Sequence, residues 1–327
     1  MAVQDFDGHV LEAVKRDICG NRGIPTFNEL ILGLPGQTYQ SFARTIATAM
    51  PALPRHDFVL FLCRLIDNTE LGDPESRERF GIQTRRCQWK TSTAVWDPII
   101  DEYQEVVVGT NDMPIADWRR TYRLSYFASA LYNLRLLRVV LQHVVDVTGS
   151  PLEAYLTQLT DSMDEAEPGT VYAELRGIFE RYTDSLLSGG PFVLPFDGEG
   201  PIVVDEAAAR VALRRYDEFL RETRQITGTN IETINEAFRY QSLITPRWGE
   251  AAAVEESFAH DWAGYTAGGG LKPDPSRVRF TPGSAVASPT FHGFAGNHLA
   301  CIRARLDVGR VEVVRQAEAF VILAGAG

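Results

Sequence analysis

The segment richest in chemical information reads ELILGLPGQT, over residues 29–38. Because side chains alternate along a strand, Glu29, Ile31 and Gly33 lie on one face, and the two leucines between them lie on the other. In a barrel, that alternation turns the leucines toward the outer helices. It also presents a carboxylate and an open glycine to the lumen, where a ligand would bind.

The end of this predicted strand is a glycine-rich turn, Gly33, Leu34, Pro35 and Gly36. Glycine lets the backbone approach a flat ligand closely, at the carboxyl end of a strand, where barrel enzymes place their sites. The alternative is a tight strand-to-helix turn that binds nothing. A phosphate-binding loop is disfavoured, since no lysine follows the second glycine as in a Walker motif.

Thiols and imidazoles give weaker indications. Four cysteines are scattered along the chain, at Cys19, Cys63, Cys87 and Cys301. Their spacing fits no zinc pair, CxxC motif or disulfide framework, so we predict reduced thiols. His292 and His298 could ligate a metal only if the fold brought them together, and surface or core histidines are the favoured interpretation. His143, within a long apolar helix, is predicted to be a core or surface residue rather than a ligand.

The elements that would position the turn alternate between strand and helix. Residues 26–32 form an apolar run between Gly/Pro segments, which predicts a short buried strand. Thr38 is a predicted cap of a helix that runs to about Met50, and residues 58–66 predict a second strand. Strand, helix and strand with short connections form a βαβ unit, which indicates a parallel sheet or a barrel.

From about residue 97 the pattern becomes helical. Pro114 opens a long predicted helix that ends at Gly149. Further helices are predicted at 151–164, 168–188, 205–227 and 231–242. The Gly/Pro-rich stretch 189–200 is predicted to be a connector. Short β-like runs follow at 277–281 and 311–323.

Two groups of side chains on these helices are expected to be structural. Four aromatic residues at helical positions predict core packing: Tyr122, Tyr126, Phe127 and Tyr132. Four acidic residues predict a solvated helix end: Asp161, Asp164, Glu165 and Glu167.

The composition excludes several classes of function. The chain has 327 residues, with 43 acidic and 32 basic side chains, so its net charge is −11. A basic face for nucleic-acid phosphates is therefore not expected. No run of about 20 apolar residues and no basic, then apolar, N-terminus is present. We expect a cytoplasmic protein with no membrane partner, of about two domains at roughly 150 residues each.

A resemblance to a known family emerges from residues 23–38, GIPTFNELILGLPGQT. They resemble the fifth strand and following turn of the radical SAM superfamily, above all its cobalamin-dependent branch. Further segments agree in order: Val10 to Arg16, Asn68 to Leu71, Asp73-Pro74, Phe80 to Ile82, Val106 to Thr110, Met113 and Trp118. The similarity covers roughly residues 5–240.

The resemblance implies roles for the residues of the turn. It implies that the strand from Glu29 to Gly33 lines an S-adenosylmethionine site, with Ile31 on the adenine and Leu34, Pro35 and Gly36 beside it. Gln37 stands where many relatives have glutamate. The family uses S-adenosylmethionine on a [4Fe-4S] cluster to make a 5′-deoxyadenosyl radical, and its cobalamin-dependent members often methylate an unactivated carbon.

The sequence also departs from the family. It has no CxxxCxxC triplet to hold the cluster. From the resemblance we also expect the first barrel strands and the cobalamin-binding domain of the family to be missing from this sequence. Only residues 18–22 stand where relatives have a full helix. We therefore expect an α/β fold: a partial (β/α) barrel over 1–110, a mainly helical domain over 111–245, and a tail over 246–327 with short β-like segments.

Two functions are compatible with this sequence. The first is the C-terminal portion of a cobalamin-dependent radical SAM enzyme, a methyltransferase acting on a small molecule or peptide. Its cluster and cobalamin ligands would lie outside this chain, for instance in a separate chain with the other barrel half. The second is a truncated or degenerate homologue that serves as a binding or assembly subunit. In either case we expect the chain alone to be inactive.

Overall fold

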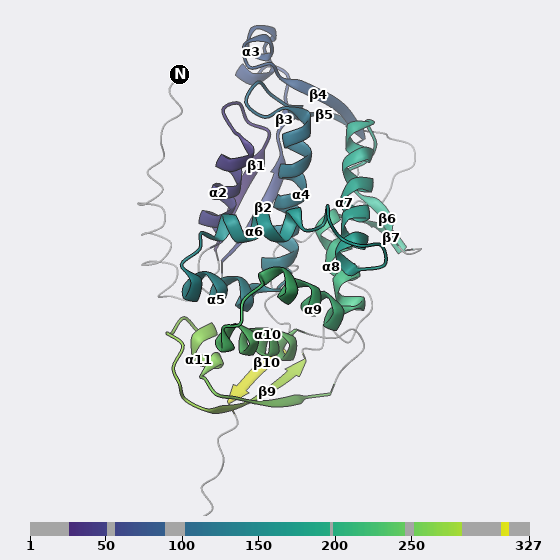
Figure 1. Ribbon diagram of the computed structural model, residues 1–327. Helices are drawn as coiled ribbons and strands as arrows, with labels where there is room; N and C mark the ends of the chain where they lie inside the picture. The colour runs from purple at the N-terminus through teal and green to yellow at the C-terminus, as the bar shows by residue number, and fades with distance from the viewer. Residues whose placement is uncertain are drawn as a thin grey trace, which may run out of the picture.

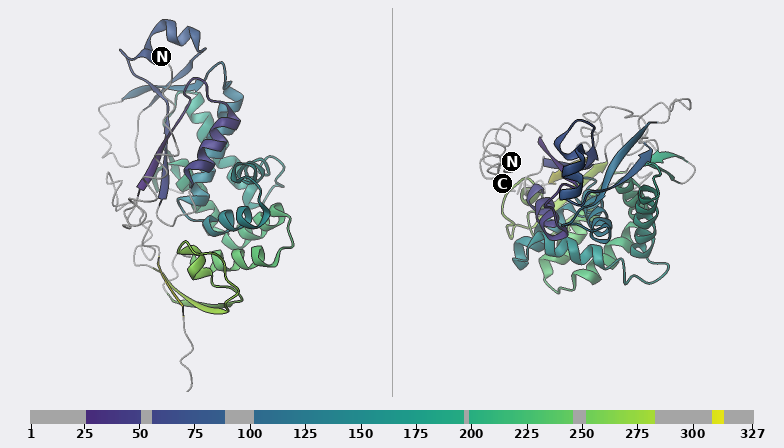
Figure 2. Two further views of the ribbon diagram at one scale, coloured as in Figure 1. Left: turned by 90° about the vertical axis from the view of Figure 1, so that its left-hand side faces the viewer. Right: turned by 90° about the horizontal axis from the view of Figure 1, so that it is seen from above.

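The structure, a computed structural model, describes residues 26–50, 56–88, 102–196, 199–245, 252–282 and 309–313. These residues form a mixed α/β protein. Its strands gather on one side and most of its helices on the other, and a further small sheet lies at the far end (Figures 1 and 2).

Two parallel strands carry the segment singled out in the sequence. β1 (Thr26–Leu32) pairs with β2 (His56–Leu62) in parallel, with Glu29 opposite Val59 and Ile31 opposite Phe61. The bounds of β1 are those predicted from its flanking glycines and prolines. A parallel pair requires a crossover connection, which here is a helix.

That crossover is α2 (Tyr39–Ala49), as predicted. The Ser41 N–H donates to the Thr38 hydroxyl oxygen at 3.1 Å, and the Thr38 N–H donates to the Ser41 hydroxyl oxygen at 2.9 Å. This reciprocal capping satisfies two amides that a helix start leaves without partners. Phe42 and Ile46 of α2 are buried with Leu32 of β1, which fixes the helix on one face of the strands.

The second predicted strand changes its partner part-way. The next sheet contains, in spatial order, β3 (Arg64–Leu65), β5 (Tyr103–Gly109) and β4 (Gln83–Gln88), all antiparallel to their neighbours. Between β2 and β3, the Cys63 N–H donates to the Leu32 carbonyl at 2.7 Å, and its carbonyl accepts from the Val107 N–H at 2.8 Å. Cys63 therefore joins the parallel pair to the antiparallel sheet.

Within the described residues, seven helices lie between β5 and β8: α4 (Ile115–Tyr132), α5 (Arg138–Thr148), α6 (Leu152–Asp161), α7 (Val171–Leu187), α8 (Val204–Arg214), α9 (Tyr216–Thr227) and α10 (Glu232–Ile244). Two helices that were each predicted as continuous are each divided into two in the structure. The first breaks after Tyr132, where Arg135 has a left-handed φ of 63°. The second breaks at Arg215, whose φ of −126° and ψ of 44° are not helical.

The helical pattern expected from about residue 97 was wrong for β5, and β4 was not predicted either. Other elements that were not predicted are shorter: η2 (Glu70–Gly72), α3 (Pro74–Arg79), β6 (Leu194–Phe196), β7 (Glu199–Ile202), β8 (Val254–Phe258) and α11 (Trp262–Thr266). The predicted connector at 189–200 contains β6 and the start of β7, which pair antiparallel. β9 (Ser276–Pro282) confirms the run at 277–281, and β10 (Gly309–Val313) covers the start of the run at 311–323. β8, β9 and β10 form one antiparallel sheet.

The described ranges contain no closed barrel, and β1 and β2 are their one parallel pair. No helix in these ranges is long and apolar enough to cross a membrane. One hydrophobic core includes Leu32, Trp118 and Phe280, from all three predicted segments. The boundaries at 110 and 245 stay predictions.

Side chains on α4 confirm one structural expectation and refine the other. The four aromatic residues are buried in the core, with exposed fractions between 0% and 5%. The acidic helix end is only partly solvated, because Asp161 pairs with Arg120 at 3.4 Å and Asp164 pairs with Arg123 at 2.6 Å. Two of the four carboxylates therefore connect α6 and the loop after it to α4.

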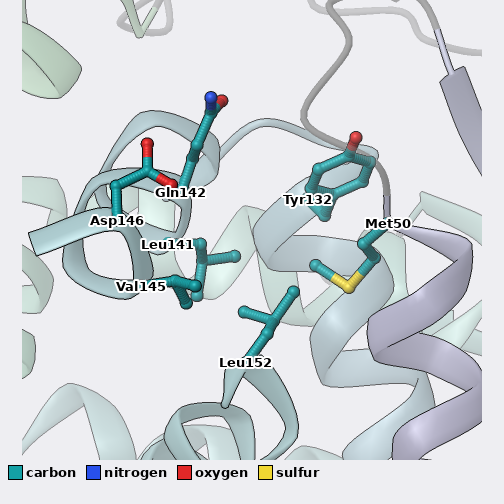
Figure 3. Close-up of a pocket in the computed structure, with 7 residues that line it drawn as sticks. All are labelled: Met50, Tyr132, Leu141, Gln142, Val145, Asp146 and Leu152. Atoms are coloured by element: carbon teal, nitrogen blue, oxygen red, sulfur yellow. The ribbon is translucent and has the colours of Figure 1, made fainter. Parts of the chain in front are cut away.

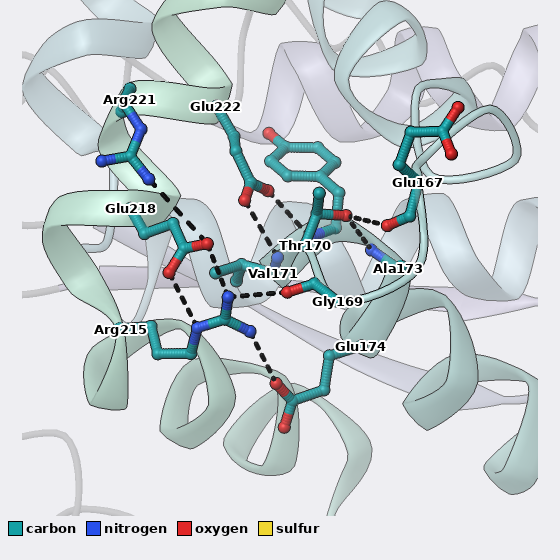
Figure 4. A network of polar contacts seen from close by, with 11 residues as sticks. Glu167, Gly169, Thr170, Val171, Ala173, Glu174, Arg215, Glu218, Arg221 and Glu222 are labelled. Carbon is teal, nitrogen blue, oxygen red and sulfur yellow. Dashed lines mark hydrogen bonds and ion pairs between the residues drawn. The ribbon is translucent and has the colours of Figure 1, made fainter.

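A further polar network fixes α9 against the start of α7 (Figure 4). The Glu222 carboxylate accepts from the Val171 and Tyr172 amides at 3.0 and 3.1 Å. Arg215 donates to the Gly169 carbonyl at 2.7 Å. Because Glu222 occupies the amides at this helix N-terminus, the network is a structural clamp.

Candidate functional site

The exposed face of β1 and β2 carries an apolar pair. Ile31 and Phe61 are 41% and 39% exposed and lie opposite each other in the parallel register. Glu29, on the same face of β1, is exposed. Leu30 and Leu32 face the core and are 8% and 1% exposed. The two faces of this strand are therefore arranged as its alternation predicts.

Beyond Ile31 and Phe61, this face ends in a small cluster of packed side chains. Its buried members are Cys63, Leu65 and Val107, with Leu34, Leu71 and Ile82 against them. A Cβ at Gly33 would lie 3.2 Å from the Val107 carbonyl oxygen and 3.3 Å from the Cys63 Cβ. The expectation of an open glycine at this position was therefore wrong, because the cluster fills the space beside it.

The turn from Gly33 to Gly36 is held by the side chain of Gln37. Its Oε1 accepts from the Gly33 amide at 2.9 Å and from the Leu34 amide at 3.0 Å. Its Nε2 donates to the Ile31 carbonyl at 2.9 Å. One side-chain amide thus satisfies three backbone groups where the strand ends.

Gly36 is the open glycine of this turn. Its φ is +84°, and a Cβ would find no atom within 4 Å. Its N–H donates to the Asp112 carboxylate at 3.1 Å. Together with the two amides bound by Gln37, this leaves the turn without the free N–H groups that bind phosphate. A neutral or cationic ligand fits this end of the strands better than an anion.

Two curated proteins of related sequence bear on this site. The chain is 24% identical over 335 residues to the cobalamin-dependent radical SAM methyltransferase TokK of Streptomyces tokunonensis, covering 91% of this chain and 49% of that protein. It is also 24% identical over 341 residues to a 2-(S-pantetheinyl)-carbapenam-3-carboxylate methyltransferase of Streptantibioticus cattleyicolor, covering 94% and 50%. These comparisons support kinship with the cobalamin-dependent radical SAM methyltransferases.

The similarity covers only part of each relative, which limits what can be inferred about this chain. The chain spans about half the length of these relatives. No protein-family model matches it. The methyltransferase activity is named for those two proteins, and the roles of the individual residues in the turn of this chain stay predictions.

The thiols of the described residues do not fit the iron–sulfur cluster of the radical SAM family. The family's cluster needs three cysteine ligands close together, and the described residues contain two cysteines, Cys63 and Cys87, both buried. Cys63 packs in the small cluster beside Gly33, and the Cys87 thiol donates to the Leu186 carbonyl at 3.3 Å. No group of three metal-binding side chains occurs in this part of the chain.

Of the histidines and the other cysteines considered in the sequence, the structure describes His143 alone, and it is not part of the face formed by Ile31 and Phe61. His143 is a core residue, with its ring edge-on to Trp262 at 4.9 Å and to Tyr265 at 5.6 Å between centroids. Burial lowers its pKa, which favours the neutral ring. The other two cysteines, Cys19 and Cys301, and the two histidines considered as metal ligands, His292 and His298, lie outside the described ranges.

A small cavity of about 100 Å³ lies at the other end of α2 (Figure 3). Its walls are mostly apolar, with Tyr132, Gln142 and Asp146 as the polar groups. Met50 lines it, just after the last residue of α2, whereas the turn precedes the first. The cavity is therefore not part of the face formed by Ile31 and Phe61.

Sequence reasoning missed Phe61 and Asp112. Phe61 lies within a predicted strand, but its position beside Ile31 depends on a register that the sequence did not specify. Asp112 is 76 positions from Gly36, and only the fold brings the two together. The one available signal was the alternation of Val59, Phe61 and Cys63, which indicates a shared face.

Proposed function

We propose that this chain carries the adenosine-binding part of an S-adenosylmethionine site in a cobalamin-dependent radical SAM methyltransferase. The observation that carries the proposal is the exposed pair of Ile31 and Phe61 beside the turn at Gly33 to Gly36. An adenine ring is flat and apolar on its faces, so two neighbouring apolar side chains on a rigid strand pair suit it. The kinship with TokK supports the same interpretation.

The charges near the turn favour this ligand over nucleotides. Glu29 is exposed on the same face, and the Asp112 carboxylate binds Gly36. S-adenosylmethionine carries a cationic sulfonium and no phosphate, whereas ATP would bring several negative charges toward these carboxylates. With the amides of Gly33, Leu34 and Gly36 already bound, no compensating donors remain in the turn.

The proposed methyl acceptor is an unactivated carbon of a small molecule or peptide. One relative is named as a methyltransferase of a pantetheinyl carbapenam carboxylate, and a small-molecule acceptor is proposed for this chain by that likeness. We propose that the ligands of the cluster and of the cobalamin lie outside this chain, since no group of three metal-binding side chains occurs among the described residues.

The outer edge of β1 supports a role in assembly. Within the described residues β1 pairs only with β2, so its other edge can accept a further strand. We propose that such a strand completes a barrel around the face of Ile31 and Phe61, from the remainder of a longer protein or from a separate chain. A non-catalytic assembly subunit, the second candidate function, would use the same edge without binding S-adenosylmethionine.

Calorimetric titration of the chain with S-adenosylmethionine and with ATP distinguishes these functions. The enzymatic proposal expects saturable binding of S-adenosylmethionine and none of ATP. Equal or tighter binding of ATP would refute the charge argument. Absence of any S-adenosylmethionine binding, together with self-association in sedimentation, would favour the assembly subunit.

A further inference from the structure

The turn at Gly33 to Gly36 is tethered on two sides by side chains from different parts of the chain. Gln37 binds its inner half through the Gly33 and Leu34 amides. Asp112 binds its outer half through the Gly36 amide. Both glycines have positive φ angles, +106° and +84°, which glycine adopts without strain. Because glycine also adopts many other conformations, contacts such as these are needed to hold the turn in a single one.

Asp112 itself lies in a firmly held loop between β5 and α4. The Thr110 amide donates to the Met113 carbonyl at 2.9 Å, and the Met113 amide donates to the Thr110 hydroxyl at 3.1 Å. Next to Asp112, the Asn111 amide donates to the Phe80 carbonyl at 2.9 Å, and its side chain donates to the Arg79 carbonyl at 3.1 Å. The Asp112 carboxylate is therefore presented from a fixed backbone.

We propose that Asp112 is a positioning residue, which together with Gln37 of the turn itself holds Gly36 in the one conformation that admits the adenosine end of the ligand. This inference rests on the proposed function. Gln37 keeps the strand end closed by pairing with its backbone groups. Asp112 fixes the position of Gly36, the part of the turn with open space beside it. Neither side chain needs to touch the ligand in this arrangement.

The charge of Asp112 has a separate effect that substitution can isolate. Asp112→Asn keeps an oxygen that can accept from the Gly36 amide, but it removes the negative charge. Asp112→Ala removes both the acceptor and the charge. Asp67→Ala is the matched control, because Asp67 is an exposed carboxylate in the loop after β3.

Hydrogen exchange of the Gly36 amide, measured by NMR on the full chain without ligand, tests the tether directly. We expect Asp112→Ala to accelerate exchange about tenfold, as loss of a hydrogen bond to a charged group predicts. Asp112→Asn should retain most of the protection, and Asp67→Ala should match the parent. Equal Gly36 exchange in all four proteins would overturn the tether. A Tm within the parent's range for each variant excludes general unfolding as the cause.

Calorimetry with S-adenosylmethionine on the same four proteins tests the positioning role. Weaker binding by Asp112→Ala, with recovery in Asp112→Asn, would support it. Unchanged affinity in an Asp112→Ala protein whose Gly36 amide exchanges fast would overturn it. If the parent binds no S-adenosylmethionine but shows the expected exchange pattern, the tether is supported and the proposed function fails.

Discussion

At the scale of single residues, the two glycines of the turn solve different problems. Gly33 is a packing residue, because Cys63 and Val107 fill the space where its side chain would lie. Gly36 is a conformational residue, with open space beside it and a backbone that L side chains rarely adopt. The two glycines of the turn are therefore required for different reasons. Of the two positions, only Gly36 has open space beside it for a ligand.

Alanine substitution should separate these two roles. We expect Gly33→Ala to lower the free energy of unfolding by about 2 to 3 kcal/mol, from backbone strain plus overpacking. Gly36→Ala should cost about 1 kcal/mol, from backbone strain alone. Urea unfolding of both variants measures the difference. Equal losses would contradict the packing assigned to Gly33.

The buried thiols lead to a second prediction at this scale. Because burial raises the pKa of Cys63 and Cys87 to about 11, few thiolates are present near neutral pH. In a protein with Cys19→Ser and Cys301→Ser, we expect no rapid reaction with a disulfide reagent at about pH 8 while the chain is folded. Both thiols should react in guanidinium. Fast reaction of the folded protein would show that one of them is accessible.

At the scale of elements, the junction between α4 and β2 depends on one buried side chain. Asn133 Oδ1 accepts from the Phe58 amide at 3.2 Å, and its Nδ2 donates to the Phe58 carbonyl at 2.7 Å. These bonds mimic a strand partner on the edge of β2 that faces away from β1. They also place α4 where the chain must turn before α5.

Removal of Asn133 should therefore destabilise the junction. Asn133→Ala leaves two buried backbone groups without their partner, which predicts a loss of about 2 to 4 kcal/mol in the free energy of unfolding. Asn230→Ala, at an exposed position between α9 and α10, serves as the control and should change little. If Asn133→Ala lowers the free energy of unfolding no more than Asn230→Ala does, the backbone groups of Phe58 must find other hydrogen-bond partners.

These elements also show what the sequence could predict. β1 and α2 were predicted because glycine, proline and a capping threonine mark their ends locally. The break between α4 and α5 near Asn133 was not predicted. The apolar residues keep their helical spacing through the break, and the break depends on contacts with a strand far away in the sequence. β4 reads QTRRCQ and lacks an apolar alternation, so it carries no strand signal.

The candidate site shows the same division between local and distant information. The face of Ile31 follows from alternation alone, and the structure confirms it. Phe61 depends on strand register, and Asp112 depends on the path of the chain through β5. Contacts between residues tens of positions apart require the fold, and these contacts hold the turn.

At the scale of the whole molecule, one buried carboxylate docks the C-terminal sheet on α10. Glu236 accepts from the Ala259 amide and from the His260 ring, both at 2.5 Å. Burial alone would raise its pKa, but these hydrogen bonds hold the pKa below its usual range. Arg239 of α10 adds bonds to Glu256 and to the Ser257 carbonyl of β8.

The depressed pKa of Glu236 makes this docking sensitive to acid. A carboxylate with a lowered folded-state pKa stabilises the fold above its ordinary pKa, near 4.5, and that stability is lost as the pH falls through the folded-state value. We expect Glu236→Gln to be less stable than the parent at neutral pH, and the difference should shrink below about pH 4.5. Urea unfolding across this pH range measures it. A difference independent of pH would contradict the assignment.

We propose above all that the face of Ile31 and Phe61 receives the adenine of S-adenosylmethionine. Saturation-transfer NMR with the chain and S-adenosylmethionine tests it most directly, since it detects weak binding and reports which ligand protons contact the protein. We predict the strongest transfer to adenine H2 and H8, lost in Ile31→Glu and kept in Ile66→Glu, a change at another exposed isoleucine. Equal transfer in the parent and in Ile31→Glu, or none in the parent, would contradict the claim.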